Sequence, residues 1–328
     1  MSSFACLTFG KKHNTENNNY FKAFFYQHSL QNLNNSEIKL TYPFDFLYKT
    51  QPESYSFVEA RSKALFDLYQ KIRLSFKPLR ETNIIKLSMG LHKTNEVDQL
   101  IDIKNATNNT IPLYEGKSME QFRILPAKLV YVVDKYYVAK KTKNDFLNYR
   151  IAFRNIASST NKRTLIATLL PPMTAGTFSL WIERNSVKLP ISNKLFTLGI
   201  LNSYVSDFII RQLITVNVNL PFSGQLPIPF YKDLVDADTI VQIVKELLKE
   251  NKGYYLDLDK LVPGNAYSNY THDELIAELN ARVMIDFNLT REEVVTLMKT
   301  FESAKHKRSV QQETQRIIDC YDKLSEEK

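Results

Sequence analysis

The chain has few cysteines and few glycines, and both scarcities exclude classes of function. Cys6 and Cys320 are the only two cysteines among 328 residues, and they stand at opposite ends of the sequence. They match neither a zinc spacing nor a disulfide framework, which favours a reducing cytoplasm. The eight glycines form no cluster that could cradle a phosphate or a cofactor, and the five histidines show no ligand spacing. We therefore expect no metal site.

Long apolar runs are also missing. No run approaches the ~20 residues that a membrane-spanning helix needs, and the opening Met-Ser-Ser-Phe-Ala-Cys lacks the basic start and apolar stretch of a signal peptide. We expect a cytoplasmic protein without a membrane partner. The hydrophobic content of 44%, with 12% aromatic residues, is nevertheless ample for a packed core.

Catalytic patterns are absent as well. No nucleophile elbow supports Ser/His/Asp chemistry, and the nearest match to the Glu-x-Lys of a metal-dependent nuclease is Glu115-Gly116-Lys117. We expect no catalytic residues in this chain.

Positive charge is concentrated in the first two-thirds of the chain. Residues 1–236 hold 30 Lys and Arg against 18 Asp and Glu, a net charge of +12, whereas residues 237–328 hold 13 against 17, a net charge of −4. A basic region beside an acidic one suits a DNA-facing domain joined to a protein-facing one. On charge alone, a slightly basic soluble protein is the better interpretation.

The apolar pattern predicts an α+β protein in which a mixed, mostly β domain precedes a helical spacer or bundle. The expected strands lie at 3–10, 20–26, 84–91, 128–139, 149–156, 163–170, 178–182 and 215–220, with a loop at 11–19. Helical spacing returns between Lys194 and Ile214. Prolines at 227 and 229 favour an extended exit, and we place a domain boundary after it, near Tyr231.

Capping boxes mark the expected helix starts. Ser56–Glu59 precedes a helix with Leu65, Leu68, Tyr69 and Ile72 on one face, and Thr271–Glu274 and Thr290–Glu293 open two amphipathic helices of the last third. The predicted division is residues 1–45 as an N-terminal hairpin, 46–231 as an α/β domain and 232–328 as a helical domain.

Three phrases between residues 91 and 172 stand out. They are Leu-His-Lys-Thr-Asn-Glu (91–96), Pro-Leu-Tyr-Glu-Gly-Lys-Ser-Met-Glu-Gln-Phe (112–122) and Tyr-Arg-Ile-Ala-Phe-Arg-Asn-Ile-Ala-Ser-Ser-Thr-Asn-Lys-Arg-Thr-Leu-Ile-Ala-Thr-Leu-Leu-Pro-Pro (149–172). Leu-Asn-Ser-Tyr-Val-Ser-Asp-Phe (201–208), Leu-Pro-Ile-Pro (226–229) and residues 278–293 extend the pattern. Together they resemble the target-recognition half of type IIG restriction–modification enzymes and their phage-exclusion relatives, which are large adenine methyltransferases. The resemblance runs from about residue 45 to the end, although Gln-Phe-Arg-Ile (121–124) departs from the relatives.

The catalytic half of such an enzyme is not present. The only Pro-Pro, at 171–172, follows Leu170 and precedes Met173, so it cannot form the Asn/Asp-Pro-Pro-Tyr/Phe loop that grips an adenine. The resemblance therefore implies sequence-specific recognition of double-stranded DNA on behalf of an adenine methyltransferase domain or subunit. That partner would flip the base and bind S-adenosylmethionine; we expect no cofactor in this chain.

Polar residues of the three phrases and of one strand end are the candidate DNA contacts. Lysines and arginines would bind phosphates, while asparagines could pair with adenine edges. The candidates are Lys93, Thr94, Asn95, Lys117, Gln121, Lys140, Lys141, Lys143, Arg150, Arg154, Asn161, Lys162 and Arg163. The alternatives are ordinary polar loops, a turn kept for packing at 114–122, a solvated hairpin tip at 140–143 and a buried network for Arg154.

Two other functions fit the sequence less well. An enzyme with a nuclease-like centre would need its acids clustered around a metal, yet the acidic third is predicted to form capped helices. A protein-interaction or anti-restriction module would present an acidic, DNA-mimicking face, yet the region in question has a net charge of +12.

Overall fold

The computed structural model describes most of the chain in two compact units, residues 1–66 and 67–328. The described residues are 19–25, 39–50, 57–156, 161–213, 218, 223–251, 253–303 and 305–326. The predicted strand at 3–10 lies outside them, as do nearly all of the loop at 11–19 and of the strand at 215–220. The chain is an α+β protein with several small sheets and a helical C-terminal region, as the sequence predicts.

The first unit contains a short hairpin and an aromatic cluster. Strand β1 (Tyr20–Ala23) pairs antiparallel with β2 (Leu40–Pro43), which leads into helix α1 (Phe44–Thr50). Tyr42 is fully buried because it stacks on Phe21, with 5.1 Å between ring centroids, and contacts Phe66 at 4.2 Å. The predicted strand at 20–26 is therefore confirmed over its first four residues.

Helix α2 (Lys63–Ser75) begins later than predicted. Residues 57–60 are not helical, so the proposed capping box at 56–59 is wrong. Instead the Ser62 hydroxyl accepts a hydrogen bond from the Leu65 N–H at 3.3 Å and so satisfies a free donor of the first turn. The predicted apolar face is real, since Leu68, Tyr69 and Ile72 are buried.

Two four-stranded sheets form the β part of the second unit. The first has the order β10-β9-β12-β3 and is antiparallel throughout. Its strands are β3 (Lys86–Met89), β9 (Arg150–Arg154), β10 (Ala167–Leu170) and β12 (Leu180–Arg184). They confirm the four strands predicted at 84–91, 149–156, 163–170 and 178–182.

The second sheet has the order β11-β5-β8-β4. Its strands are β4 (Ile101–Asp102), β5 (Thr110–Tyr114), β8 (Tyr131–Asp134) and β11 (Ala175–Gly176), of which β11 runs parallel to β5. A separate hairpin pairs β6 (Met119–Glu120) with β7 (Arg123–Ile124). Short 3-10 helices connect these strands and their neighbours: Val97–Gln99, Ile103–Asn105, Gly116–Ser118, Pro126–Lys128, Asp145–Leu147, Ser186–Lys188 and Tyr231–Asp233.

The strand predicted at 128–139 ends at Asp134, and the prediction is wrong beyond it. Helix α4 (Lys135–Thr142) follows because the Asp134 carboxylate accepts hydrogen bonds from the N–H groups of Tyr136 and Tyr137, both at 2.9 Å. The lysines at 140 and 141 therefore belong to the last helical turn, and Lys143 caps it in the left-handed region with φ of 51°. No hairpin tip forms there.

Helices complete the second unit. They are α3 (Leu79–Thr82), α5 (Ile191–Leu201), α6 (Tyr204–Leu213), α8 (Ala237–Lys249), α9 (Leu258–Leu261), α10 (His272–Asp286), α11 (Arg291–Lys299) and α12 (Lys307–Glu326). Both capping boxes predicted for the last third are confirmed, because Thr271 and Thr290 accept hydrogen bonds from the N–H groups of Glu274 and Glu293.

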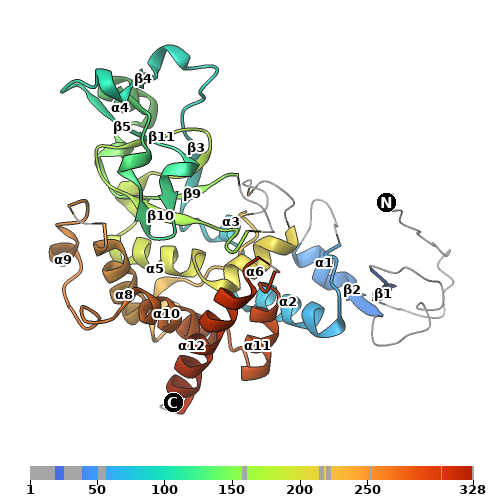
Figure 1. Cartoon of the computed structure of the whole chain (residues 1–328). Helices are drawn as coiled ribbons and strands as arrows, with labels where there is room; N and C mark the ends of the chain where they lie inside the picture. The colour runs from blue at the N-terminus through green and yellow to red at the C-terminus, as the bar shows by residue number, and fades with distance from the viewer. Residues whose placement is uncertain are drawn as a thin grey trace, which may run out of the picture. The chain divides into compact units, whose positions relative to one another are not determined.

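The predicted helical segment 194–214 is two helices rather than one. Asn202 ends α5, and its side-chain amide makes two hydrogen bonds to the backbone of Ala167 in β10, at 2.9 and 3.0 Å. Figure 1 shows α5 and α6 between the sheets above and α8, α10 and α12 below. Gly199 permits close packing of α5 on α8, since a Cβ there would lie 2.8 Å from Ile240. The core thus continues across the boundary predicted near Tyr231.

Gly90 and Gly176 form a very close backbone approach in the β part. A Cβ at Gly90 would collide with the carbonyl groups of Gly176 and Thr177, neither of which is a flexible side-chain end. We predict that Gly90→Ala lowers the free energy of unfolding by about 2–3 kcal/mol, because the backbone must move to admit a methyl group. Gly116→Ala is the matched control, since the nearest atoms there lie 3.8 Å away. Chemical denaturation compares the two, and equal stability of both variants would contradict this account.

Candidate nucleic-acid interface

The loop that follows β3 is tied to helix α4 through Glu96. Its carboxylate accepts hydrogen bonds from the His92 N–H at 2.7 Å, from the Tyr137 hydroxyl and from the Lys141 ammonium group. Leu91 joins the start of the loop to β11, because its N–H donates to the Gly176 carbonyl at 2.8 Å. The conformation of residues 92–96 is therefore fixed against the C-terminal half of α4.

A second carboxylate brings this loop together with the turn that follows β5. Glu115 is buried, and it forms ion pairs with Lys93 of the loop and with Lys117 of the turn, the latter at 3.2 Å. The Lys93 ammonium group also lies 5.1 Å from the ring centroid of Tyr131, a favourable cation–π distance. Lys117 keeps 56% of its side chain exposed, so one of its faces remains open to a partner.

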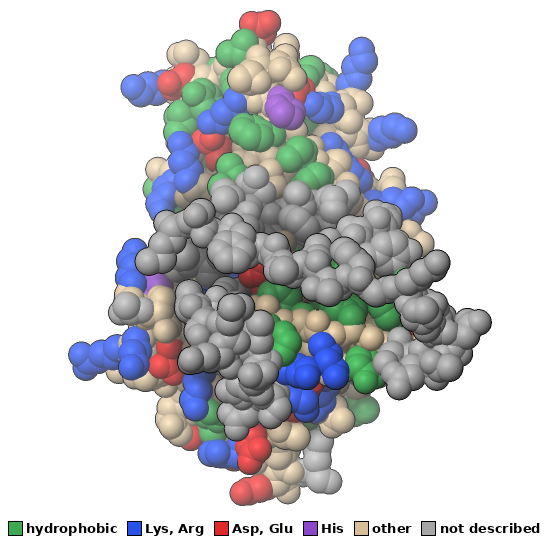
Figure 2. All heavy atoms as spheres, turned by 90° about the vertical axis from the view of Figure 1, so that its right-hand side faces the viewer, with side chains coloured by type: hydrophobic (Ala, Val, Ile, Leu, Met, Phe, Trp, Pro, Cys, Tyr) green, Lys and Arg blue, Asp and Glu red, His purple; other side chains and the backbone are tan. Residues whose placement is uncertain are grey.

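These contacts bring Lys93, Lys117 and Lys141 together through Glu115 and Glu96, and the other four predicted residues belong to the same loop or to the same helix end. Among the described residues, Lys140 and Lys143 make no ion pair, and both are exposed. Thr94 and Asn95 are joined to each other at 3.3 Å. We call the set the α4 surface: Lys93, Thr94, Asn95, Lys117, Lys140, Lys141 and Lys143. Figure 2 shows Lys and Arg side chains on both flanks of the upper part of the molecule, which contains the two sheets.

Three predicted contacts are hydrogen-bonded within the β part instead; Arg150 is buried, and Arg154 and Gln121 are partly buried. The Arg150 guanidinium is buried and donates to the carbonyl and hydroxyl oxygens of Thr174, at 2.6 and 3.0 Å. Arg154 donates to the Met119 carbonyl, and the Gln121 amide donates to the carbonyls of Leu165 and Asn202 at 2.9 and 3.3 Å. Donors engaged in this way stabilise the fold, and we do not retain these three residues as DNA contacts.

The predicted contacts at 161–163 lie against α6 and α12. Arg163 pairs with the fully buried Asp207 at 2.7 Å, and its guanidinium carbon lies 4.0 Å from the centroid of the Tyr204 ring. Lys162 pairs with Glu313 at 2.8 Å. The Asn161 carbonyl accepts a hydrogen bond from Arg211, while Asn161 as a whole is exposed. Only Asn161 retains a side chain that could reach a base from this segment.

Sequence reasoning missed one half-buried cation of the β part. Arg184 ends β12 and lies on the same face of the strand as Ile182, where it lines a pocket together with Arg150. The signal in the sequence was the alternation of the strand, which places residues 182 and 184 on one face. The alternation shows which face of β12 carries Arg184, but it does not show which residues pack on that face.

The attachment of the loop to α4 should depend on pH. Partial burial alone would raise the pKa of Glu96, but the hydrogen bonds from Lys141, Tyr137 and the His92 N–H outweigh it and lower the pKa below the ordinary value of 4.5. Because the pKa of Glu96 is lower in the folded state than in the unfolded state, its charged form stabilises the fold at pH values above the ordinary pKa. This contribution is lost as the pH falls through the pKa of the folded state.

We therefore predict that Glu96→Gln destabilises the protein at neutral pH and that the difference from wild type disappears on acidification. Unfolding curves at a series of pH values measure it. Glu120→Gln is the control, because the Glu120 carboxylate is half-exposed and its 3.9 Å distance to Arg123 is longer than a hydrogen bond. A Glu96→Gln effect that stays constant down to acidic pH would refute the role of the charged carboxylate.

Metal clusters and membrane spans are both absent from the described part of the chain. Within those ranges, no group of three or more His, Cys, Asp and Glu side chains is placed to hold a metal ion. No helix there combines the length and apolar character that crossing a membrane requires. Comparison with protein-family models and with curated proteins finds no match to this chain.

Proposed function

We propose that this chain recognises double-stranded DNA through the α4 surface and delivers that specificity to a separate adenine methyltransferase. The observation that carries the proposal is that Glu115 and Glu96 hold two lysine-bearing loops together and against the lysine-rich end of α4. Glu96 and Glu115 pair with three of the five lysines of the α4 surface, whereas Lys140 and Lys143 form no ion pair with another described residue. A phosphate backbone is the partner that such a charge distribution attracts.

The chemistry of the α4 surface divides into two roles. Lys140 and Lys143 carry exposed ammonium groups, and positive charge at the C-terminal end of α4 is favoured by the helix dipole. They would bind phosphates without reading sequence. Thr94 and Asn95 are the side chains on this surface that could hydrogen-bond with base edges, and an asparagine amide matches adenine.

The methyltransferase part of the proposal rests on the resemblance of the phrases at 91–96, 112–122 and 149–172 to target-recognition regions. The first phrase forms the loop held by Glu96, and the second forms β5 and the turn with Lys117. The third includes β9 and β10, which lie in the sheet that supports the loop. Because the chain lacks an Asn/Asp-Pro-Pro-Tyr/Phe loop, the flipped adenine and S-adenosylmethionine are assigned to the partner.

The salt dependence of DNA binding tests the first part. We predict weak binding to duplex DNA whose affinity falls steeply with salt, with a slope of log affinity against log salt near ~0.9 per contacted phosphate. Five lysines set an upper limit of about 4.5 for the α4 surface. Fluorescence anisotropy between low and moderate salt measures the slope. Affinity that does not change with salt would exclude a phosphate-led interface.

Reconstitution tests the second part. An adenine methyltransferase that lacks its own recognition domain should methylate duplex DNA site-specifically only when this chain and S-adenosylmethionine are both present. Methyl transfer that is equally site-specific without the chain would remove the proposed role, even if the chain binds DNA.

A further inference from the structure

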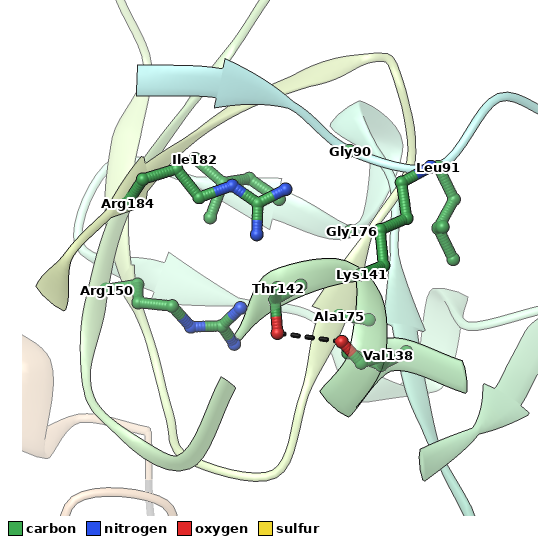
Figure 3. Close-up of a pocket in the computed structure, with 10 residues that line it drawn as sticks. All are labelled: Gly90, Leu91, Val138, Lys141, Thr142, Arg150, Ala175, Gly176, Ile182 and Arg184. Carbon is green, nitrogen blue, oxygen red and sulfur yellow. Dashed lines mark hydrogen bonds between the residues drawn. The ribbon is translucent and has the colours of Figure 1, made fainter. Parts of the chain in front are cut away.

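A roomy pocket lies where the outer ends of β3 and β12 meet the start of α5. Its volume is about 270 Å³, close to the lower end of the ~300–1,000 Å³ that small-molecule sites enclose. Arg184 lines both this pocket and the narrow space beside α4 that Figure 3 shows. The narrow space is filled by its own lining, whereas the roomy pocket can admit one small organic molecule.

Positive charge prevails among the described residues that line the roomy pocket. Lys86 and Arg184 stand opposite each other in the antiparallel register of β3 and β12, and Lys188 follows in the next 3-10 helix. The one acid among these lining residues, Glu183, is paired with Lys194 at 2.8 Å. Like charges directly opposite each other destabilise two paired strands, so an anion bound between them is favoured.

Two of these cations remain available to a ligand. The Asp145 carboxylate accepts hydrogen bonds from the N–H groups of Asn185 and Ser186, at 3.0 and 3.1 Å, and it also attracts the Arg184 guanidinium. Asp145 thus fixes the turn after β12 and partly compensates the arginine. Lys86 and Lys188, by contrast, are exposed and form no ion pair with another described residue.

The other walls of the pocket offer an aromatic ring and amide groups. Phe230 lines the pocket and keeps 36% of its surface exposed. The neighbouring Tyr231 is held by an edge-on contact with Phe196, with 5.6 Å between ring centroids. Asn83 and Asn193 also line the pocket, and their side-chain amides form no hydrogen bond with another described residue. A planar base can stack on such a ring, and free amides can donate to and accept from its edge.

We propose that this pocket binds a nucleotide, with its phosphate between Lys86 and Lys188 and its base against Phe230 and the amides of Asn83 and Asn193. Inorganic phosphate would use only the lysines, and a neutral nucleoside would use only the ring and the amides. The nucleotide is either free in solution or one unit of a nucleic acid strand. Binding of the free nucleotide does not rest on the proposed function.

The test titrates the full chain, without DNA, with the 5′-monophosphates of adenosine, guanosine, cytidine and uridine. Calorimetry and thermal unfolding are measured at constant ionic strength, with inorganic phosphate and the four nucleosides as the separate halves of the ligand. We expect at least one monophosphate to raise the melting temperature and to bind at least about tenfold more tightly than either of its halves. The proposal is overturned if none of the four does so.

Variants of the lining locate the binding. The double variant Lys86→Met and Lys188→Met should weaken nucleotide binding at least about tenfold, and Phe230→Ala should weaken it about fivefold or more, because a stacked base is lost. Lys104→Met with Lys128→Met is the matched control, since both lysines are exposed and lie outside the pocket lining.

The outcomes of these variants are separable from folding. The replaced lysines are exposed, so both double variants should melt like wild type when no nucleotide is present. The proposal is overturned if the pocket variant or Phe230→Ala binds nucleotide as tightly as wild type. It is also overturned if the control variant loses as much affinity as the pocket variant, because the effect would then be one of general charge.

A second arm identifies the source of the nucleotide. If a nucleic acid strand supplies it, the free monophosphate should compete with a short oligonucleotide, and the pocket variant should weaken oligonucleotide binding. If the ligand is a free nucleotide, the pocket variant should bind the oligonucleotide no more weakly than the control variant. The variant that lacks Lys117, Lys140 and Lys143 should bind the monophosphate like wild type, so failure of the proposed DNA binding leaves this result readable.

Discussion

Replacing Asp207 with alanine is expected to lower the free energy of unfolding by about 3–5 kcal/mol. Its side chain is fully buried and accepts from the Arg163 Nε at 2.7 Å and from the Thr164 N–H at 3.0 Å, and it pairs with Arg211 at 3.4 Å. Without the carboxylate, two largely buried guanidinium groups lose their ion-pair partner.

Denaturant unfolding of Asp207→Ala gives this number directly. Asp98→Ala, an exposed aspartate in a short 3-10 helix, removes the same charge and should change stability by less than about 0.5 kcal/mol. If both variants unfold alike, Asp207 is not the anchor of this region. The same reasoning explains why Arg163→Ala is a poor probe of DNA binding, since loss of the Asp207 pair would unfold the segment that carries it.

The sequence predicted helices and strands correctly where the residues that determine the structure are close together in the chain. The two capping boxes at Thr271 and Thr290 are sufficient to start α10 and α11, because each satisfies its own free donors. The strand containing Arg150 and the segment around Leu198 were found for the same reason, since their apolar period is visible in the chain itself.

Errors arose where the deciding contact was distant or the pattern ambiguous. Apolar residues continue past Asp134, so the stretch reads as one long strand, although the aspartate caps a helix there. Ser56–Glu59 fits a capping box, yet Ser62 is the residue that caps α2. Neither error could be corrected from apolar spacing alone.

In the candidate site, too, local patterns were predicted correctly and distant contacts were not. Alternation correctly separated Ile151 and Phe153 from Arg150 and Arg154, but it could not show that the second face is also covered. Ala152 on that face packs in one cluster with Tyr114, a residue far earlier in the chain. Both faces of β9 are therefore covered: Arg150 is buried, and Arg154 at the end of the strand is partly buried.

The lysines of the α4 surface should account for most of the DNA affinity. We predict that the triple variant Lys117→Ala, Lys140→Ala and Lys143→Ala binds duplex DNA on the order of a hundredfold more weakly at low salt. Its salt slope should fall by about 0.9 for each phosphate that the variant no longer binds. Lys93 is kept in this variant so that Glu115 retains an ion-pair partner, which protects the fold.

The decisive measurement is duplex affinity of this triple variant beside a control with the same change of charge. Lys299, Lys305 and Lys323 are exposed lysines of the helical region and form no ion pair with another described residue, so their alanine variant provides that control. With thermal melting as the folding check, we predict a large loss of affinity for the α4 set and little change for the control. If the helical set weakens binding as much or more, the DNA does not lie against the α4 surface.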